Sequence, residues 1–170
     1  MEFDHQVLQE YMDRLQSGHE EDRVQIYLEM RALSFPWDDE LLLVALSDPS
    51  PRVRSVVCDT LSENSDSRVI SSLLEFLRDQ DPGIRSLSMT ILSRLGALAL
   101  PQVEKYLNDG DPDVRIFAAG IMGETGLKKA FEGLKKALET PEENLRYAAA
   151  EALGKIAEPK AIPLLINCLE

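Results

Sequence analysis

One stretch near the middle of the chain, Asp111-Pro112-Asp113-Val114-Arg115 with an apolar run that ends at Gly123, recurs at a nearly constant interval. Its arginine is repeated at intervals of 31, 30 and 31 residues, at Arg54, Arg85, Arg115 and Arg146. Self-similarity at such a period is typical of a stacked array, in which one repeat cannot bury its apolar faces alone. The period therefore fixes the class of architecture before any other feature is considered.

Each repeat is predicted to be a pair of helices, here called A and B. Asp111 is a good N-cap and Pro112 suits the first helical position, where its missing N–H costs nothing. Gly126, like Gly96 one repeat earlier, suits a left-handed position that ends helix A. The apolar residues of helix A lie at helical spacing, and helix B carries a second such set. These two sets are Val114, Phe117, Ala118, Ile121 and Met122, then Ala130, Phe131, Leu134, Ala137 and Leu138.

A row of leucines in the B helices gives the period over the whole chain. The row is Leu15, Leu46, Leu77, Leu107, Leu138 and Leu169. From it we expect an all-α fold, a right-handed superhelix of stacked antiparallel helix pairs with about eleven helices in one domain, residues 1–170. Residues 1–49 form a divergent cap and first repeat, and residues 50–170 form four regular repeats. The expected pairs are 51–64 with 67–79, 82–95 with 98–108, 112–125 with 128–139, and 142–156 with 159–169.

The first A helix, roughly residues 20–33, has two alternative registers. Arg23 keeps the 31-residue spacing to Arg54, whereas Val24, Tyr27 and Leu28 fit a register two residues later. The sequence leaves this choice open. Residues 4–16 are predicted to form the N-terminal capping helix, with a polar outer face.

These repeats resemble the HEAT-like repeat of the phycobilisome-lyase type. The best copy is Leu145-Arg146 followed by a small-residue run to Ala152-Leu153-Gly154, and then Ala161-Ile162-Pro163-Leu164-Leu165. The resemblance covers residues 50–170 clearly, and 1–49 only through the leucine row. It implies a solenoid, and its family includes scaffolds, chromophore lyases and iron hydroxylases.

Composition excludes several classes of function. The chain is 44% hydrophobic and 6% aromatic, and no stretch approaches the roughly 20 apolar residues of a membrane span. The net charge is −12; residues 1–50 alone carry 12 acidic and 3 basic side chains, so the concentrated basic face that nucleic acid requires is missing. The acidic surface indicates either simple solubility or a basic protein partner.

The N-terminus lacks the layout of a signal peptide. Cys58 and Cys168 occupy core-like repeat positions, so we expect a cytoplasmic protein with no disulfide.

Catalytic and metal-binding patterns are absent from the sequence. His5 and His19 are the only histidines, and only His19-Glu20 matches the His-Glu pairs of the iron hydroxylases. Neither cysteine has the spacing of a zinc site, and no Ser or Cys stands beside a credible base. The sequence therefore predicts no catalytic residue, no cofactor and no metal.

The arginine column allows two interpretations. Arg54, Arg85, Arg115 and Arg146 could form an anion-binding track, but each lies close to an acidic helix cap. The resemblance implies a ladder in which these arginines pair with Asp81, Asp111 or Glu142 of the same or a neighbouring repeat. A guanidinium can bond a carboxylate and still reach a backbone carbonyl. We expect the ladder to be structural.

Binding is expected on the B helices, which line the concave face in this fold. One surface column reads Asp13, Val44, Glu75, Lys105, Lys136 and Asn167, and a neighbouring column reads Ser72, Gln102, Gly133 and Leu164. This surface is either an ordinary solvated face or a groove for a protein segment of mixed charge. In the second case Glu75, Lys105 and Lys136 steer the segment, and Trp37 or Val44 adds apolar contact. Trp37 has its own alternative, a plug that closes the divergent first repeat.

The last B helix, Ala161 to Leu169, is apolar nearly all round. Such an end should not be left in water, so the chain is either part of a longer array or packs on a partner or on a second copy of itself.

Taken together, the sequence predicts a non-enzymatic scaffold that binds a protein. A subunit of a phycobilin-type chromophore lyase is the first alternative, and an oxygen-dependent hydroxylase is the second.

Overall fold

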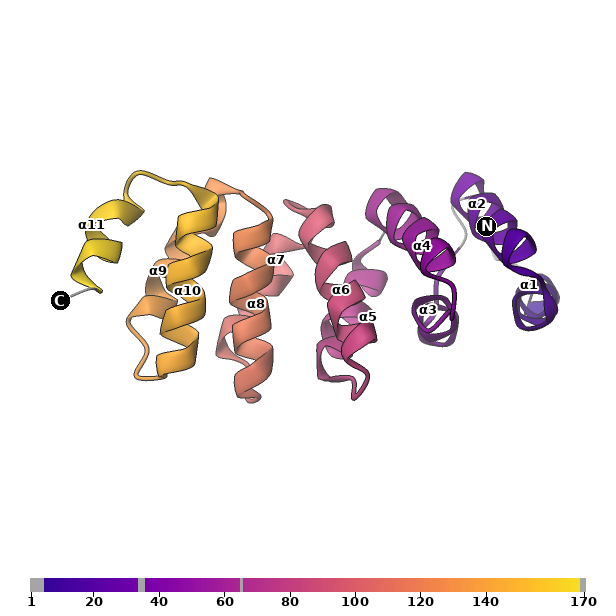
Figure 1. Cartoon of the computed structure of the whole chain (residues 1–170), viewed down its shortest axis with the longest axis horizontal. Coiled ribbons are helices and arrows are strands. Elements are labelled where there is room, and N and C mark those ends of the chain that lie inside the picture. The colour runs from indigo at the N-terminus through magenta and orange to yellow at the C-terminus, as the bar shows by residue number, and fades with distance from the viewer. Residues whose placement is uncertain (1–4, 34–35, 65, 169–170) are drawn as a thin grey trace.

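The computed structural model describes residues 5–33, 36–64 and 66–168, and within these ranges all regular secondary structure is helical. Figure 1 shows one row of helix pairs in two layers, with the two ends of the chain at opposite ends of the row. The A layer contains α2 (Glu20–Ala32), α4 (Pro51–Asn64), α6 (Pro82–Leu95), α8 (Pro112–Glu124) and α10 (Glu143–Ile156). The B layer contains α1 (His5–Ser17), α3 (Asp39–Leu46), α5 (Ser67–Glu75) with η1 (Phe76–Arg78), α7 (Leu100–Val103) with η2 (Glu104–Asn108), η3 (Lys128–Ala130) with α9 (Phe131–Leu138), and α11 (Ala161–Asn167). The predicted all-α solenoid is confirmed.

Helix ends follow the local sequence signals. The Asp81 and Asp111 carboxylates accept from the main-chain N–H groups of Gly83 and Asp113, at 2.7 and 2.9 Å, while Pro82 and Pro112 open the helices. Gly96 and Gly126 have φ of 51° and 63°, the left-handed backbone predicted for them. Ala157 takes the corresponding position after α10 with φ of 50°, although it has a Cβ.

The B layer is less regular than the A layer. Residues 98–108, predicted to form one helix, contain only a four-residue α-helix followed by five residues of 3₁₀-helix. This is the repeat that lacks one residue. A 3₁₀-helix rises about 2.0 Å per residue rather than about 1.5 Å, so a given number of residues spans a longer distance; shorter 3₁₀ turns also occur in the repeats of full length, at η1 and η3.

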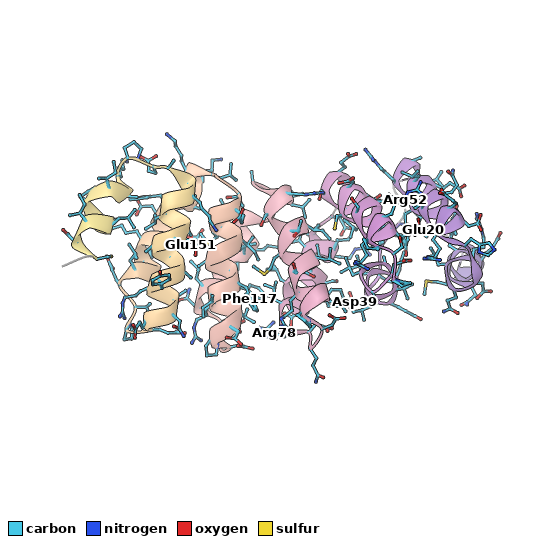
Figure 2. All side chains as sticks on the ribbon, in the orientation of Figure 1. Glu20, Asp39, Arg52, Arg78, Phe117 and Glu151 are labelled. Carbon is cyan, nitrogen blue, oxygen red and sulfur yellow. The ribbon has the colours of Figure 1, made fainter. Side chains whose placement is uncertain are left out.

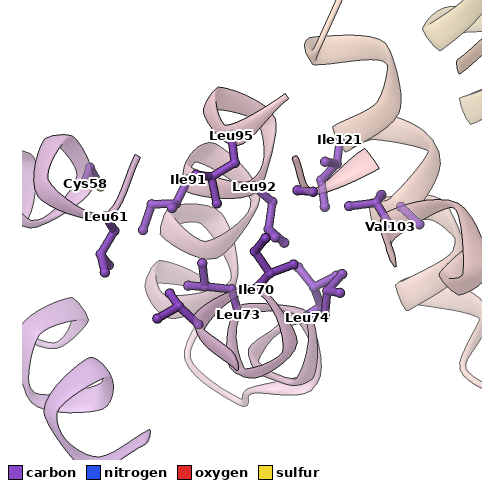
Figure 3. Packing of buried hydrophobic residues seen from close by; sticks show 14 of the residues in the cluster. Cys58, Leu61, Ile70, Leu73, Leu74, Ile91, Leu92, Leu95, Val103 and Ile121 are labelled. Atoms are coloured by element: carbon purple, nitrogen blue, oxygen red, sulfur yellow. The ribbon is translucent and has the colours of Figure 1, made fainter. Parts of the chain in front are cut away.

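The core runs continuously between the two layers. Leu77 and Leu107 of the leucine row are both buried, as are the residues between α4, α5 and α6 that Figure 3 shows in contact. The residues labelled there include Leu61, Ile70, Leu73, Ile91 and Leu92. Burial of these apolar faces supplies most of the favourable free energy of folding.

The structure decides the register of α2 in favour of Arg23. Ile26, Tyr27 and Met30 are fully buried, whereas Leu28, which the later register would place inside, is 40% exposed. Arg23 bonds to the Asp48 carboxylate of the next repeat through Nε at 2.7 Å and Nη2 at 3.1 Å. The first repeat is therefore a variant of the same unit rather than a shifted one.

Helices α8 and α10 of the A layer approach each other closely at a point where both side chains are small. A Cβ added to Gly123 of α8 would lie 2.7 Å from Cα and 2.8 Å from Cβ of Ala152 in α10. Gly154 holds the same repeat position in α10, and a Cβ there would meet nothing within 4 Å. The two glycines differ only in whether another repeat covers them.

We therefore expect opposite effects from one substitution at these two positions. Gly123→Ala should lower the free energy of unfolding by about 1–3 kcal/mol, because the α8–α10 seam must separate to admit a methyl group. Gly154→Ala should raise it by about 0.5–1 kcal/mol, because alanine is the better helix former and the site is open. Urea unfolding of both variants measures the difference. Equal effects of the same sign would contradict the close approach at Gly123.

Candidate partner-binding face

The B face is defined here as the exposed surface of the B-layer helices around Glu75, Lys105 and Lys136. These three side chains and Asp13 are exposed, and Val44 is half-buried. The second predicted column lies deeper, between successive B helices. Ser72, Gln102 and Leu164 are half-buried and Gly133 is buried, where an added Cβ would lie 3.0 Å from Glu104 Oε1. The sequence predicted both columns to lie on the surface, whereas in the structure the second column lies deeper than the first.

Glu75 is held by two neighbours rather than left free. Its Oε1 accepts from the Tyr106 hydroxyl at 2.8 Å, and its Oε2 accepts from Arg78 Nη1 at 3.0 Å. The Arg78 guanidinium lies 5.6 Å from the centre of the Tyr106 ring and also bonds the Asp109 carboxylate through Nη2. Figure 2 labels Arg78 where it extends from the B layer. This cluster joins two repeats and offsets the charge of Glu75.

Asp109 is the acidic end of this cluster. Its pKa lies below the usual value because the carboxylate accepts from the main-chain N–H of Asp111, at 2.9 Å, and from Arg78. Partial burial of the carboxylate acts to raise the pKa, but the hydrogen bonds and the nearby positive charge outweigh it. At neutral pH the charged form of Asp109 therefore stabilises the junction between the two repeats.

Lys105 and Lys136 present uncompensated charge on the B face. Both are exposed, and among the described residues no carboxylate lies within ion-pair distance of either ammonium group. Lys136 also borders a surface cavity of about 310 Å³, whose walls combine the apolar Leu107 and Ala137 with charged residues of both signs, namely Arg115, Glu104, Asp109 and Glu142. The cavity is therefore of mixed charge, and the two exposed lysines are the cations of this surface that have no ion pair among the described residues.

The arginine column bonds mainly to its own inter-repeat loop. In each of Arg54, Arg85, Arg115 and Arg146, Nη1 donates to the main-chain carbonyl six residues earlier. Those carbonyls would otherwise lie unpaired in a tight turn, so each arginine fixes the junction of two repeats. With that nitrogen occupied in all four residues, the geometry favours a structural role over an anion track.

Within the arginine column and its first-repeat equivalent Arg23, pairing with a carboxylate of the next repeat is seen at two places among the described residues. Arg115 bonds Glu142 through Nε at 2.9 Å and Nη2 at 2.8 Å, and Arg23 bonds Asp48 in the same way. Asp81 and Asp111, predicted as ladder residues, instead cap the first turns of α6 and α8. Arg54 and Asp81 border the same cavity of about 410 Å³ without an ion pair between them.

Trp37 is not an exposed aromatic anchor, and that prediction is wrong. Its side chain is only 7% exposed and stacks on Tyr27, with ring centres 6.0 Å apart and planes 8° from parallel. The reason is the loop before α3, which turns Trp37 inward against α2. Phe35, the other aromatic residue of this turn, lies outside the described residues.

The two cysteines differ in environment. Cys58 is buried, as its repeat position predicts, and burial raises the pKa of its thiol. Cys168 is exposed, so its prediction as a core residue is wrong. The equivalent Ala137 is buried because the next repeat covers it, and no described repeat follows Cys168.

Two features are absent from the described residues. No group of three or more His, Cys, Asp or Glu side chains is arranged to hold a metal ion. No helix in the described part of the chain has the length and hydropathy needed to cross a membrane.

Sequence reasoning missed two sets of cross-repeat contacts. The first is the Tyr106–Glu75–Arg78–Asp109 cluster. The second is a line of ion pairs between exposed side chains of neighbouring A helices. It includes Arg52 with Glu20, which are labelled in Figure 2. It also includes Arg94 with Asp59 at 2.7 Å and Lys155 with Glu124 at 2.8 Å. Their only signal in the sequence is opposite charge at spacings near the repeat period.

Comparison with known proteins places the chain among helical repeats. The sequence profile of the family described as HEAT repeats matches residues 39–109 and 100–170. The chain is similar to the uncharacterized phycocyanin operon protein Z of Pseudanabaena tenuis, 29% identical over 140 residues that cover 77% of this chain and 69% of that protein. It is also similar to a HEAT repeat-containing taxis protein of Halobacterium salinarum, 28% identical over 75% of this chain and 32% of that protein. The phycocyanobilin lyase subunit alpha of Thermosynechococcus vestitus is 32% identical over 48% of this chain and 35% of that protein. The matched region is thus about a third of the length of two of these relatives.

The Asp109 contacts lead to a pH-dependent prediction. Asp79 holds the same repeat position and accepts the same type of N–H bond, from Asp81 at 2.8 Å, but only Asp109 bonds Arg78. We expect Asp109→Asn to lower the free energy of unfolding at pH 7 by about 0.5–1 kcal/mol more than Asp79→Asn does.

The sign of the pH effect follows from the lowered pKa of Asp109. The stabilisation is complete above the unfolded-state pKa of about 3.9 and is lost as the pH falls through the lower folded-state pKa. The difference in free energy of unfolding between the two variants should therefore shrink at acidic pH. Urea unfolding at pH 7 and at pH 3 measures it, and a gap that is the same at both values would contradict the assignment.

Proposed function

The chain belongs to the HEAT-repeat family, and on that premise we propose that it is a non-enzymatic scaffold that binds a protein partner through its B face. In such arrays the curved inner surface is the extended binding surface, and we take the B face to be that surface. The charge pattern supports this assignment, because its two free cations occupy one repeat position in successive repeats.

Lys105 and Lys136 carry the proposal. They stand 31 residues apart, as the period requires, and each is exposed without an ion-pair partner among the described residues, whereas Glu75 is already bonded to Tyr106 and Arg78. The charges of the two lysines therefore remain available to a partner, and that of Glu75 is offset. A segment of mixed charge fits, with its acidic part opposite the two lysines and its basic part opposite the acidic first repeats.

Apolar contact comes from the floor of the face rather than from Trp37. Leu107 and Ala137 border the cavity beside Lys136, and Val44 is half-buried near the start of the B layer. Exposed charges of this kind act mainly on the rate of association and on the choice of partner, and the apolar floor adds affinity.

A second candidate function is that of a subunit of a phycobilin-type chromophore lyase. The observation in its favour is the similarity to a protein named phycocyanobilin lyase subunit alpha. Incubation of the chain with phycocyanobilin and apo-phycocyanin, with and without added lyase subunits, distinguishes the two functions. A coloured covalent adduct that requires this chain would favour the lyase, and no adduct would favour the scaffold.

We also propose a reducing compartment, the cytoplasm, as the place of action. Both cysteines are free thiols, and neither the buried Cys58 nor the exposed Cys168 is bridged. Exposed free thiols are typical of compartments in which disulfides do not persist.

The scaffold proposal predicts which charges matter. Lys105→Glu with Lys136→Glu should reduce partner recovery at least about tenfold, because both cations facing the acidic part of the segment are reversed. The measurement is quantitative mass spectrometry of proteins that co-purify with the tagged chain from its native cells.

The matched control reverses two cations of the A layer, Arg52→Glu with Arg94→Glu, and changes the net charge by the same amount. Both arginines are exposed, so their ion pairs contribute little to stability. This control should retain the partner. Equal loss in both variants, or no loss in either, would rule out recognition by the B face.

A further inference from the structure

The seams between successive A helices are bridged by ion pairs in the C-terminal halves of the helices. Among the described residues, three of the four seams have such a bridge: Arg31 with Glu63 between α2 and α4, Arg94 with Asp59 between α4 and α6, and Lys155 with Glu124 between α8 and α10. No ion pair or hydrogen bond between described residues joins α6 to α8. The seam near the middle of the row in Figure 1 is therefore the one without a bridge.

The missing bridge follows from the side chains at two repeat positions. Thr90 of α6 holds the position of Asp59, and Glu124 of α8 holds the position of Arg94. A pair like the one between α4 and α6 needs opposite charges at these two positions, and here one side chain is neutral. Each charged residue beside this seam bonds the helix on its other side instead, Arg94 to Asp59 at 2.7 Å and Glu124 to Lys155 at 2.8 Å.

A surface cavity of about 400 Å³ lies between α6 and α8. Arg94 and Glu124 both border it, so two opposite charges stand at one cavity without a bond between them. Met89 also borders it and is only half-buried, although α8 follows α6 in the array. At the same repeat position, Cys58 of α4 and Ala119 of α8 are 4% and 0% exposed. The next A helix therefore covers α6 less completely than it covers α4 or α8.

The two sides of α8 differ in how closely the neighbouring A helix approaches. A Cβ added to Gly120, on the side of α6, would lie 3.8 Å from Met89 Cε, an ordinary van der Waals distance. On the side of α10, a Cβ added to Gly123 would lie 2.7 Å from Cα of Ala152. The seam to α10 thus admits no closer approach, whereas the seam to α6 has space for one.

The starts of α6 and α8 are joined, in contrast to their C-terminal halves. Arg78 lies four residues before Pro82, the first residue of α6, and it bonds the carboxylate of Asp109. Asp109 lies three residues before Pro112, the first residue of α8. Figure 2 labels Arg78 beside these helix starts. The junction is therefore held at one end and open toward the other.

We propose that the junction between α6 and α8 is a hinge of the array. The starts of the two helices pivot on the bond between Arg78 and Asp109, and their C-terminal halves close over the cavity. On closure, Arg94 exchanges Asp59 for Glu124. The helix pairs before the hinge thereby rotate against those after it and change the curvature of the B face. This hinge goes beyond the proposed function and does not depend on it.

The exchange of ion pairs keeps the open and closed forms similar in free energy. Asp59 and Glu124 are both exposed, so either pair with Arg94 is screened by water and contributes little to stability. Lys155 loses Glu124 on closure but keeps Glu151, to which it is bonded at 2.6 Å. One exposed pair therefore replaces another, and both arrangements of the junction can be populated.

Distances between two spin labels, measured by electron paramagnetic resonance, test the hinge. The labels are attached at Ala97→Cys, just after α6, and at Lys160→Cys, in the loop between α10 and α11; both positions are exposed. Cys58→Ala and Cys168→Ser remove the native thiols. Because the seam between α8 and α10 admits no closer approach, a change in this distance reports on the seam between α6 and α8. We expect two populations, of which the shorter distance is the closed form.

Asp59→Asn removes the acid that holds Arg94 in the open form. The ratio of the shorter to the longer distance should rise about 1.5- to 5-fold, because the lost pair is an exposed one. The rise should disappear in Asp59→Asn with Glu124→Gln, since the acid across the cavity is then also removed. The matched control is Glu63→Gln, which removes the bridge between α2 and α4 and should leave both populations unchanged.

A bridge added across the seam provides a second test. Thr90→Lys places a cation at the position of Asp59, on the other side of the cavity from Glu124, and should make the shorter distance predominate. Thr90→Gln adds a neutral side chain at the same position and should not. A single distance in every variant, a rise in Asp59→Asn that persists after Glu124→Gln, an equal rise in Glu63→Gln, or equal effects of the two Thr90 variants would each overturn the hinge.

Discussion

The stacking of one A helix on the next is the contact on which the rest of the array depends, and its closeness is seen in detail between α8 and α10, where the facing side chains are small. At Gly123 and Ala152 the two helices leave no space for a single additional methyl group. This closeness lets the larger side chains on either side, such as Ile121 and Leu153, close the core. It also brings the first turn of α10 near enough for Arg115 to reach Glu142. A wider seam would lose apolar burial and this bond at once.

A repeated helix pair explains why so much of the fold could be predicted from sequence. Helix limits, caps and the leucine row follow from short-range rules applied once and then copied at the period. What could not be predicted depends on contacts between repeats or on a single unrepeated turn. Arg78 and Tyr106 meet across a repeat junction, and Trp37 turns inward from a loop that occurs once. No period within the sequence encodes either arrangement.

The same distinction separates the candidate sites. Surface position on the B face could be read from the repeat, because Lys105 and Lys136 occupy one exposed column. Which of these charges remain free could not be read from the repeat, because the charge of Glu75 is offset by residues from two repeats. An exposed acid in a sequence column is therefore not equivalent to an available charge. In a solenoid, the ion pairs between repeats decide which part of a regular surface can still attract a partner.

The B face and the apolar surface over α10 and α11 rely on different physics. The B face is polar and its free charges act at a distance, so association there would be fast and selective and would weaken as salt increases. Over α10 and α11 the exposed side chains include Tyr147, Ile162 and Ile166, and contact there would replace water over apolar surface. Salt dependence therefore distinguishes the two surfaces, because screening weakens the charge term and leaves the apolar term in place.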